Sequence, residues 1–149
     1  MNPGELADRL AIQDVLNRYA ELVDRREWTA LDEVFTEDAT VDYTSTGGQS
    51  GPLRPVMEWL ARALEPWPLN LHFISNVRVE LDGDRARARS YFQAPMGRVA
   101  ANGSHEAVIN AGTYRDELLR TAAGWRIRER VCEQVLQLGS LPPGYRIPD

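Results

Sequence analysis

Residues 71–99 read LHFISNVRVELDGDRARARSYFQAPMGRV, which is the pattern of two long strands that pair with each other. The alternation of apolar and polar residues is typical of half-buried strands, whose successive side chains point to opposite faces. Between the two halves, Asp82-Gly83-Asp84 is a hairpin turn signal. The stretch therefore predicts an antiparallel hairpin with strands over residues 71–81 and 85–99.

Two further strands are expected toward the C-terminus. Residues 106–121 and 125–136 have strand composition, and Ala122-Ala123-Gly124 supplies a turn between them. The remainder, residues 137–149, is rich in proline and glycine. It predicts an irregular tail that could lie across the mouth of a cavity.

The N-terminal half has the pattern of helices. Asn2, Pro3 and Glu5 form a helix start, with a capping side chain, a proline tolerated in the first turn and an acid near the positive end of the helix dipole. Apolar residues then recur at helical spacing. The expected elements are a helix over residues 5–24, a short helix over 29–35, a strand over 39–44 and a helix over 52–64.

Helices first and a meander of long strands afterwards are typical of an α+β chain. The helices must cover one face of the sheet, and a pocket opens between the two layers if the sheet curves around them. At 149 residues, with no repeat or composition shift, the chain is expected to form a single domain over residues 1–149.

Composition excludes several classes of function. The net charge of −5 argues against general nucleic-acid binding, which requires a basic surface. No stretch is long and apolar enough to span a membrane, and the N-terminus lacks the pattern of a signal peptide. With Cys132 as its one cysteine, the chain has no clustered Cys/His metal site. We expect a cytoplasmic protein without a metal.

Two residues stand out as candidates for chemistry. His72 lies in apolar surroundings on a predicted strand that also carries Asn76 on the same face. It is either a satisfied core residue or a proton-transfer group, since histidine titrates near physiological pH. Asp24 ends the first predicted helix, where the helix dipole disfavours a carboxylate. It is either part of an exposed ion pair with Arg25 or Arg26, or a carboxylate placed for chemistry despite that cost.

The order of the elements, with particular residues on them, is similar to that of a known superfamily. These residues are Tyr19-Ala20, Val23-Asp24, Trp28, Phe35, Asp38, Val41-Asp42-Tyr43, Leu71-His72-Phe73, Asn76, Gly112-Thr113-Tyr114 and Gly124-Trp125-Arg126-Ile127.

Over residues 5–135 the chain resembles the nuclear-transport-factor-2-like (NTF2-like) superfamily, and within it the SnoaL-like branch with scytalone dehydratase and the bile-acid 7α-dehydratases. The resemblance implies a cone-shaped, curved antiparallel sheet packed against three N-terminal helices around an apolar pocket. It is less specific for the reaction, because the fold also hosts isomerases, cyclases, epoxide hydrolases and non-catalytic subunits.

The resemblance also assigns roles by position. Asp24 and His72 match the Asp–His dyad of scytalone dehydratase, and Tyr43 matches a tyrosine that holds the substrate carbonyl. Tyr19, Asp24 and His72 match the Tyr/Asp/His set of the bile-acid dehydratases. Two departures stand out: Met96 replaces a second catalytic histidine, and Gly112 and Tyr114 replace a serine and an asparagine that reach the substrate. These departures favour a different, steroid-like or polyketide-like substrate.

The expected chemistry is proton abstraction next to a carbonyl without a cofactor. His72 acts as the base, Asp24 orients it, and Tyr19 or Tyr43 donates to the carbonyl oxygen. This set predicts a lyase or isomerase, with a dehydratase favoured over a polyketide cyclase. The alternative from another class is a small-molecule-binding protein, which would have little need of an Asp–His pair. An epoxide hydrolase ranks lowest, because that chemistry needs an Asp–Arg–Asp set in the pocket and the sequence does not place Asp116, Arg98 and Arg115 there.

The remaining expectations concern the pocket wall and self-association. The predicted substrate-binding residues are Tyr43, Trp59, Asn76, Phe92, Met96 and Tyr114. From the resemblance, a homo-oligomer (dimer or trimer) is expected to form through the outer face of the sheet. The side chains proposed for that face are Arg87, Arg89, Tyr91 and Gln93 on one strand and Arg126, Arg128 and Arg130 on another.

Overall fold

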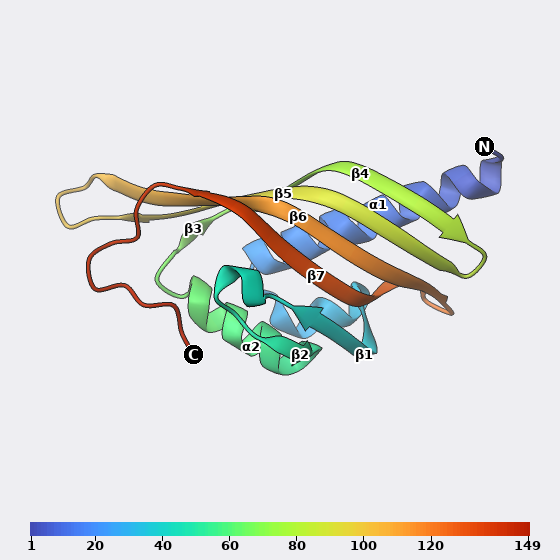
Figure 1. Ribbon diagram of the computed structural model, residues 1–149, viewed down its shortest axis with the longest axis horizontal. Helices are drawn as coiled ribbons and strands as arrows, with labels where there is room; N and C mark the ends of the chain where they lie inside the picture. Colours follow the sequence, from blue (N-terminus) through green and yellow to red (C-terminus); the bar gives the residue numbers. More distant parts are fainter.

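The computed structural model describes residues 1–149 and shows one curved sheet with the helices on its concave face (Figure 1). The elements are α1 Pro3–Asp24, η1 Trp28–Glu33, β1 Phe35–Asp42, η2 Thr44–Thr46, β2 Ser50–Pro52, α2 Leu53–Leu64, β3 Leu69–Asn70, β4 Phe73–Asp82, β5 Arg85–Val99, β6 His105–Thr121 and β7 Gly124–Leu138.

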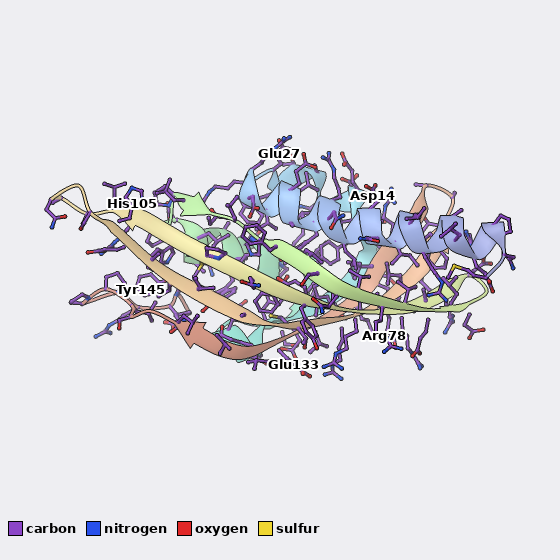
Figure 2. All side chains as sticks on the ribbon, turned by 90° about the horizontal axis from the view of Figure 1, so that it is seen from above. Asp14, Glu27, Arg78, His105, Glu133 and Tyr145 are labelled. Carbon is purple, nitrogen blue, oxygen red and sulfur yellow. The ribbon has the colours of Figure 1, made fainter.

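The sheet has seven strands in the order β2-β1-β7-β6-β5-β3, and β4 also pairs with β5. All pairs are antiparallel except β1 and β7, which run parallel. The predicted α+β class and helix-covered sheet are therefore confirmed, while the purely antiparallel sheet is corrected to a mixed one. Figure 2 shows α1 laid along one face of the strands, with Arg78 and Glu133 projecting from the opposite face.

Most element boundaries lie within two residues of those expected. The short helix is a 3₁₀ helix. The strand expected over residues 71–81 begins only at Phe73, as β4, so Leu71 and His72 lie in the break between the two-residue strand β3 and β4 and not on a strand. β7 continues to Leu138, so the irregular tail begins at residue 139. The tail turns back toward α2 (Figure 1), where the Trp59 indole N–H donates to the Pro148 carbonyl at 2.8 Å.

Both ends of α1 are defined by specific hydrogen bonds. At its start, the Asn2 side chain accepts from the Glu5 N–H at 2.9 Å and the Glu5 carboxylate accepts from the Asn2 N–H at 3.0 Å. This reciprocal pair is a capping box.

At its end, the Arg26 N–H donates to the Val23 carbonyl and the Glu27 N–H to the Leu22 carbonyl. This is a Schellman arrangement, which needs a left-handed residue after the helix. Arg26 holds that conformation with φ 58° where glycine is usual, at a cost of roughly 1–2 kcal/mol.

Two β-bulges change which side chains face inward, and each overturns an expectation. In β4 the pairing shifts between Ser75 and Arg78, and Asn76 there is exposed with φ 54°. In β7 an extra residue lies between Ile127 and Glu129, where the pairing with β6 shifts between Glu117 and Leu118. A bulge reverses the alternation beyond it. Asn76 is thus turned away from the core face, and Arg130 points into the core, not to the outer face proposed for it.

Gly112 lies at a further register shift between β6 and β7, and a side chain there has no room. A Cβ at this position would stand 2.0 Å from the Glu133 carbonyl oxygen. We expect Gly112→Ala to lower the free energy of unfolding by about 1–3 kcal/mol, because backbone must move to admit it. In Gly97→Ala, the control, the nearest atoms lie at 3.5 Å, and the change should stay within about 0.5 kcal/mol. Urea unfolding measures both, and equal losses would contradict the prediction.

None of the helices combines the length and the apolar character needed to cross a membrane.

Candidate functional site

A cavity of about 300 Å³ lies between the concave face of the sheet, α1, α2 and the C-terminal tail. No Asp, Glu, Lys or Arg side chain lines it. The lining residues are Tyr19, Tyr43, Ser45, Thr46, Gly47, Trp59, Leu60, Ala63, Leu64, His72, Phe92, Ala94, Met96, Asn110, Tyr114, Cys132, Gln134, Gln137, Leu141, Tyr145 and Ile147.

His72 lies on the wall of this cavity, and Asp24 holds it from behind. The Asp24 Oδ1 lies 2.7 Å from His72 Nδ1, and Asp24 Oδ2 accepts from the His72 backbone N–H at 2.9 Å. The His72 side chain is 7% exposed and the Asp24 side chain 17%. With Asp24 as a carboxylate, Nδ1–H donates to it and Nε2 remains for a ligand. The pairing fixes one tautomer of the ring, as the orienting member of a catalytic triad does.

The Asp24 carboxylate stands at the C-terminal end of α1, where the helix dipole disfavours it. A third hydrogen bond offsets that cost, since Asn70 Nδ2 donates to Asp24 Oδ1 at 3.1 Å. Of the two neighbouring arginines, Arg25 forms an exposed pair with Glu21, and Arg26 reaches Asn70. Asp24 is therefore not half of the exposed ion pair considered from the sequence.

Three phenols meet at the floor of the cavity. The hydroxyls of Tyr19 and Tyr43 are hydrogen-bonded to each other, and both side chains are buried. The Tyr19 ring also packs edge-on against His72, with 6.4 Å between centroids, and against Tyr114, with 5.9 Å. In the Tyr19–Tyr43 pair one hydroxyl donates to the other, so one O–H stays free to donate to a ligand.

Beneath these phenols lies a fully buried ion pair. Arg130 donates from Nε to Asp116 Oδ1 at 2.7 Å and from NH2 to Oδ2 at 2.9 Å. Its guanidinium lies over the rings of Tyr19 and Tyr114, with Cζ 4.3 Å and 3.9 Å from their centroids. Burial alone would lower the pKa of Arg130, but Asp116 raises that pKa well above its ordinary value. The Arg130 guanidinium therefore stays protonated behind the phenols, and the Asp116 carboxylate balances its charge.

Burial keeps the acidic groups of the cavity floor protonated. It raises the pKa of Tyr19, partly offset by Arg130, and raises the pKa values of Tyr43 and Tyr114 further. The pKa of the Cys132 thiol rises to about 12 for the same reason. At neutral pH the phenols are therefore hydrogen-bond donors, and the thiol is a poor nucleophile.

These raised pKa values predict a loss of stability in alkali. The folded protein holds protons that the unfolded chain releases above the ordinary pKa values of 9.0 for Cys132 and 10.0 for the tyrosines. Stability is thus fully present below pH 9 and falls as the pH rises toward 12. Urea unfolding at a series of pH values should show this decline, and Cys132→Ala or Tyr43→Phe should make it shallower. An unfolding free energy that stays constant over this window would contradict the prediction.

The structure brings most of the predicted site residues to one place. Tyr19, Tyr43, Trp59, His72, Phe92, Met96 and Tyr114 line the cavity, and Asp24 reaches it through His72. Asn76 does not line it, because the bulge in β4 turns this residue to solvent. Arg98 and Arg115 form outer pairs with Glu106 and Glu133, so neither belongs to an Asp–Arg–Asp set inside the cavity.

Sequence reasoning missed several residues of the site. Asp116 and Arg130 meet in the core because of the bulge in β7, and no local sequence pattern predicts that bulge. The carboxamides of Asn110, Gln134 and Gln137 on β6 and β7 make one end of the cavity polar. No cluster of three or more His, Cys, Asp or Glu side chains is placed to hold a metal ion.

The curved sheet, the helices on its concave face and the cavity between them define a protein of the NTF2-like fold. Residues 4–131 match the SnoaL-like domain family, and the chain belongs to that family.

The chain is also similar to other proteins over most of its length. The uncharacterized protein Rv2910c of Mycobacterium tuberculosis is 37% identical over 132 residues, which cover 88% of each chain. The structure of the Kfla4162 protein from Kribbella flavida is 28% identical with a TM-score of 0.79, covering 89% of this chain and 94% of that one. A presumed scytalone dehydratase from Novosphingobium aromaticivorans has the same TM-score at 19% identity, covering 98% and 99%. At that identity the likeness concerns the fold.

Proposed function

We propose that this protein is a cofactor-independent lyase or isomerase that removes a proton next to the carbonyl of an uncharged cyclic substrate, with dehydration as the favoured outcome. One observation supports this most strongly: His72 faces an apolar cavity while its Nδ1 lies 2.7 Å from Asp24, and a phenol pair lines the same cavity.

In the proposed reaction, His72 Nε2 takes the proton from the carbon next to the carbonyl, and the electron pair moves to the carbonyl oxygen. The free O–H of the Tyr19–Tyr43 pair donates to that oxygen, and the Arg130 cation behind the rings favours the negative charge that develops. Asp24 stabilises the imidazolium. The imidazolium then gives its proton to a hydroxyl on the next carbon, the enolate electrons form the double bond, and water leaves.

The cavity wall supports an uncharged substrate of modest size. A charged group placed inside would have no counter-charge among the lining side chains and would lose its hydration. The volume of about 300 Å³ is at the lower end of the range for ligand pockets. Compact polyketide-like ring systems therefore fit the proposal better than a full steroid nucleus. Epoxide hydrolysis by an Asp–Arg–Asp set is not supported, because the cavity wall contains neither a carboxylate nor an arginine.

A substrate panel tests the proposal. Wild type and His72→Gln would be incubated with uncharged hydroxyketones of one to four rings and with carboxylate-bearing analogues, and products would be read by chromatography and mass spectrometry. Loss of water from an uncharged ketone with wild type alone supports a dehydratase. Ring closure with wild type alone identifies a cyclase instead. If the ketones bind equally to both proteins and neither protein converts them, the proposed enzymatic activity is wrong and the protein is a small-molecule-binding protein.

We also propose that the protein forms a dimer or trimer through the outer face of the sheet. Phe73, Tyr91, Leu136 and Leu138 form an apolar patch there and are each about half exposed, and Phe73 and Leu136 share one row across β4, β5, β6 and β7. Light scattering should give a mass above that of one chain. Leu136→Lys with Leu138→Lys should shift it to the monomer, because the patch would then carry two charges. A monomeric wild type would contradict this proposal.

A further inference from the structure

Arg26 makes three hydrogen bonds from a backbone position that favours glycine. Its NH1 donates to the Leu64 carbonyl at 3.1 Å, and its NH2 donates to the Trp67 carbonyl at 2.7 Å and to Asn70 Oδ1 at 2.8 Å. The side chain thus connects the end of α1 to the end of α2, to the following loop and to β3. Because this backbone conformation is strained for any residue but glycine, we infer that the hydrogen bonds of the arginine side chain have a role that glycine could not fill.

Asn70 passes this constraint to the acid–base pair. Because the Arg26 guanidinium occupies the Asn70 Oδ1 acceptor, the amide has a single orientation, with Nδ2 toward Asp24 Oδ1 at 3.1 Å. Asn70 is buried, so water does not compete for either end of the amide. The other Asp24 oxygen accepts from the His72 backbone N–H. Both carboxylate oxygens are therefore held by donors besides the imidazole.

We propose that Arg26 is a positioning residue which, through Asn70, fixes the Asp24 carboxylate in the orientation that accepts Nδ1–H from His72. The inference rests on the proposed function of the Asp24–His72 pair. Arg26 does not line the cavity, and it acts through Asn70 and the backbone alone. Its neighbour Arg25 pairs with Glu21 on the surface and has no part in this chain of contacts.

Three variants distinguish the effect of the Arg26 side chain from that of its backbone conformation and from that of the Asn70 contact with Asp24. Arg26→Gly removes the guanidinium while relaxing the left-handed backbone, so the fold is retained. Asn70→Leu breaks the link to Asp24 and leaves the Arg26 bonds to the two carbonyls. Arg25→Ala is the matched control on the adjacent residue. Circular dichroism would verify that each variant is folded.

Two readouts test the positioning role. The first is the His72 tautomer in the free protein, observed by long-range ¹H–¹⁵N correlation. Wild type and Arg25→Ala should show one Nδ1–H form, whereas Arg26→Gly and Asn70→Leu should show a mixture. The second is turnover of a substrate found by the panel: kcat should fall roughly 10- to 100-fold in both variants while KM stays within about twofold, since misplacement by about 1 Å has effects of this size.

The double variant tests the path through Asn70. Arg26→Gly with Asn70→Leu should lose no more kcat than Asn70→Leu alone, because both changes break one chain of contacts. If the kcat losses of the two single variants multiply in the double variant, Arg26 does not act through Asn70. If His72 in Arg26→Gly keeps the single Nδ1–H tautomer of wild type, Arg26 has no positioning role. If His72→Gln keeps full turnover, the proposed function fails, and the tautomer measurement still decides the role of Arg26.

Discussion

His72→Gln should lower kcat by about 10²- to 10⁴-fold, which is the usual contribution of a positioned general base. Glutamine fills similar space and can still donate to Asp24, but it cannot take up a proton. KM should change little, because the cavity wall keeps its shape. Steady-state kinetics on a substrate from the panel measures both constants.

His105→Gln is the control, because His105 is the other of the two histidines and is exposed at the start of β6. It should leave kcat unchanged. Asp24→Asn should approach the loss of His72→Gln, since it removes the charge that orients the ring and stabilises the imidazolium. Full activity in His72→Gln, or an equal loss in His105→Gln, would contradict the assignment of the base.

Asp116→Asn should lower the free energy of unfolding by about 3–5 kcal/mol. Both members of the Asp116–Arg130 pair have fully buried side chains, and the substitution leaves the Arg130 cation in the core without a counter-charge. Such a loss is a large share of the roughly 5–15 kcal/mol that stabilises a typical domain. Urea unfolding at neutral pH measures it.

The chain contains a matched exposed pair on the same two strands. Arg115 on β6 pairs with Glu133 on β7, and both side chains are at least half exposed. Glu133→Gln should therefore cost at most about 1 kcal/mol. Replacing both buried partners, as Asp116→Leu with Arg130→Met, should restore much of the stability because no buried charge remains. A similar cost for Asp116→Asn and Glu133→Gln would show that the buried pair has no special role in the fold.

The long elements were predictable because they follow simple periodicities. The start of α1 follows from Asn2 and Glu5, and the hairpin of β4 and β5 follows from Asp82-Gly83-Asp84 between alternating residues. Turn and cap signals are local, so a single chain displays them.

The resemblance to scytalone dehydratase predicted that Asp24 and His72 would pair, and the structure places them in hydrogen-bond contact. Their sequence separation of 48 residues leaves no local signal for this contact.

The interior of the site was harder to predict because bulges shift the alternation. Strict alternation placed Asn76 on the same face as His72, and it placed Arg130 on the outer face of the sheet. One extra residue in each strand shifts the alternation, so that Asn76 faces solvent and Arg130 faces the core. Arg26 was equally hidden, because only the fold brings Asn70 within reach of its guanidinium. Sequence periodicity therefore described the layers of this protein better than the polar contacts between them.

Deuterium exchange at the carbon next to the carbonyl is the most direct test of the proposed chemistry. An uncharged ketone that binds the cavity would be incubated in D₂O with wild type, His72→Gln and Asp24→Asn, and its mass followed over time. Wild type should exchange this hydrogen well above the rate in buffer, and both variants should fall toward the buffer rate. Exchange at the same rate in all three proteins, or none with a ketone that demonstrably binds, would contradict proton abstraction by His72.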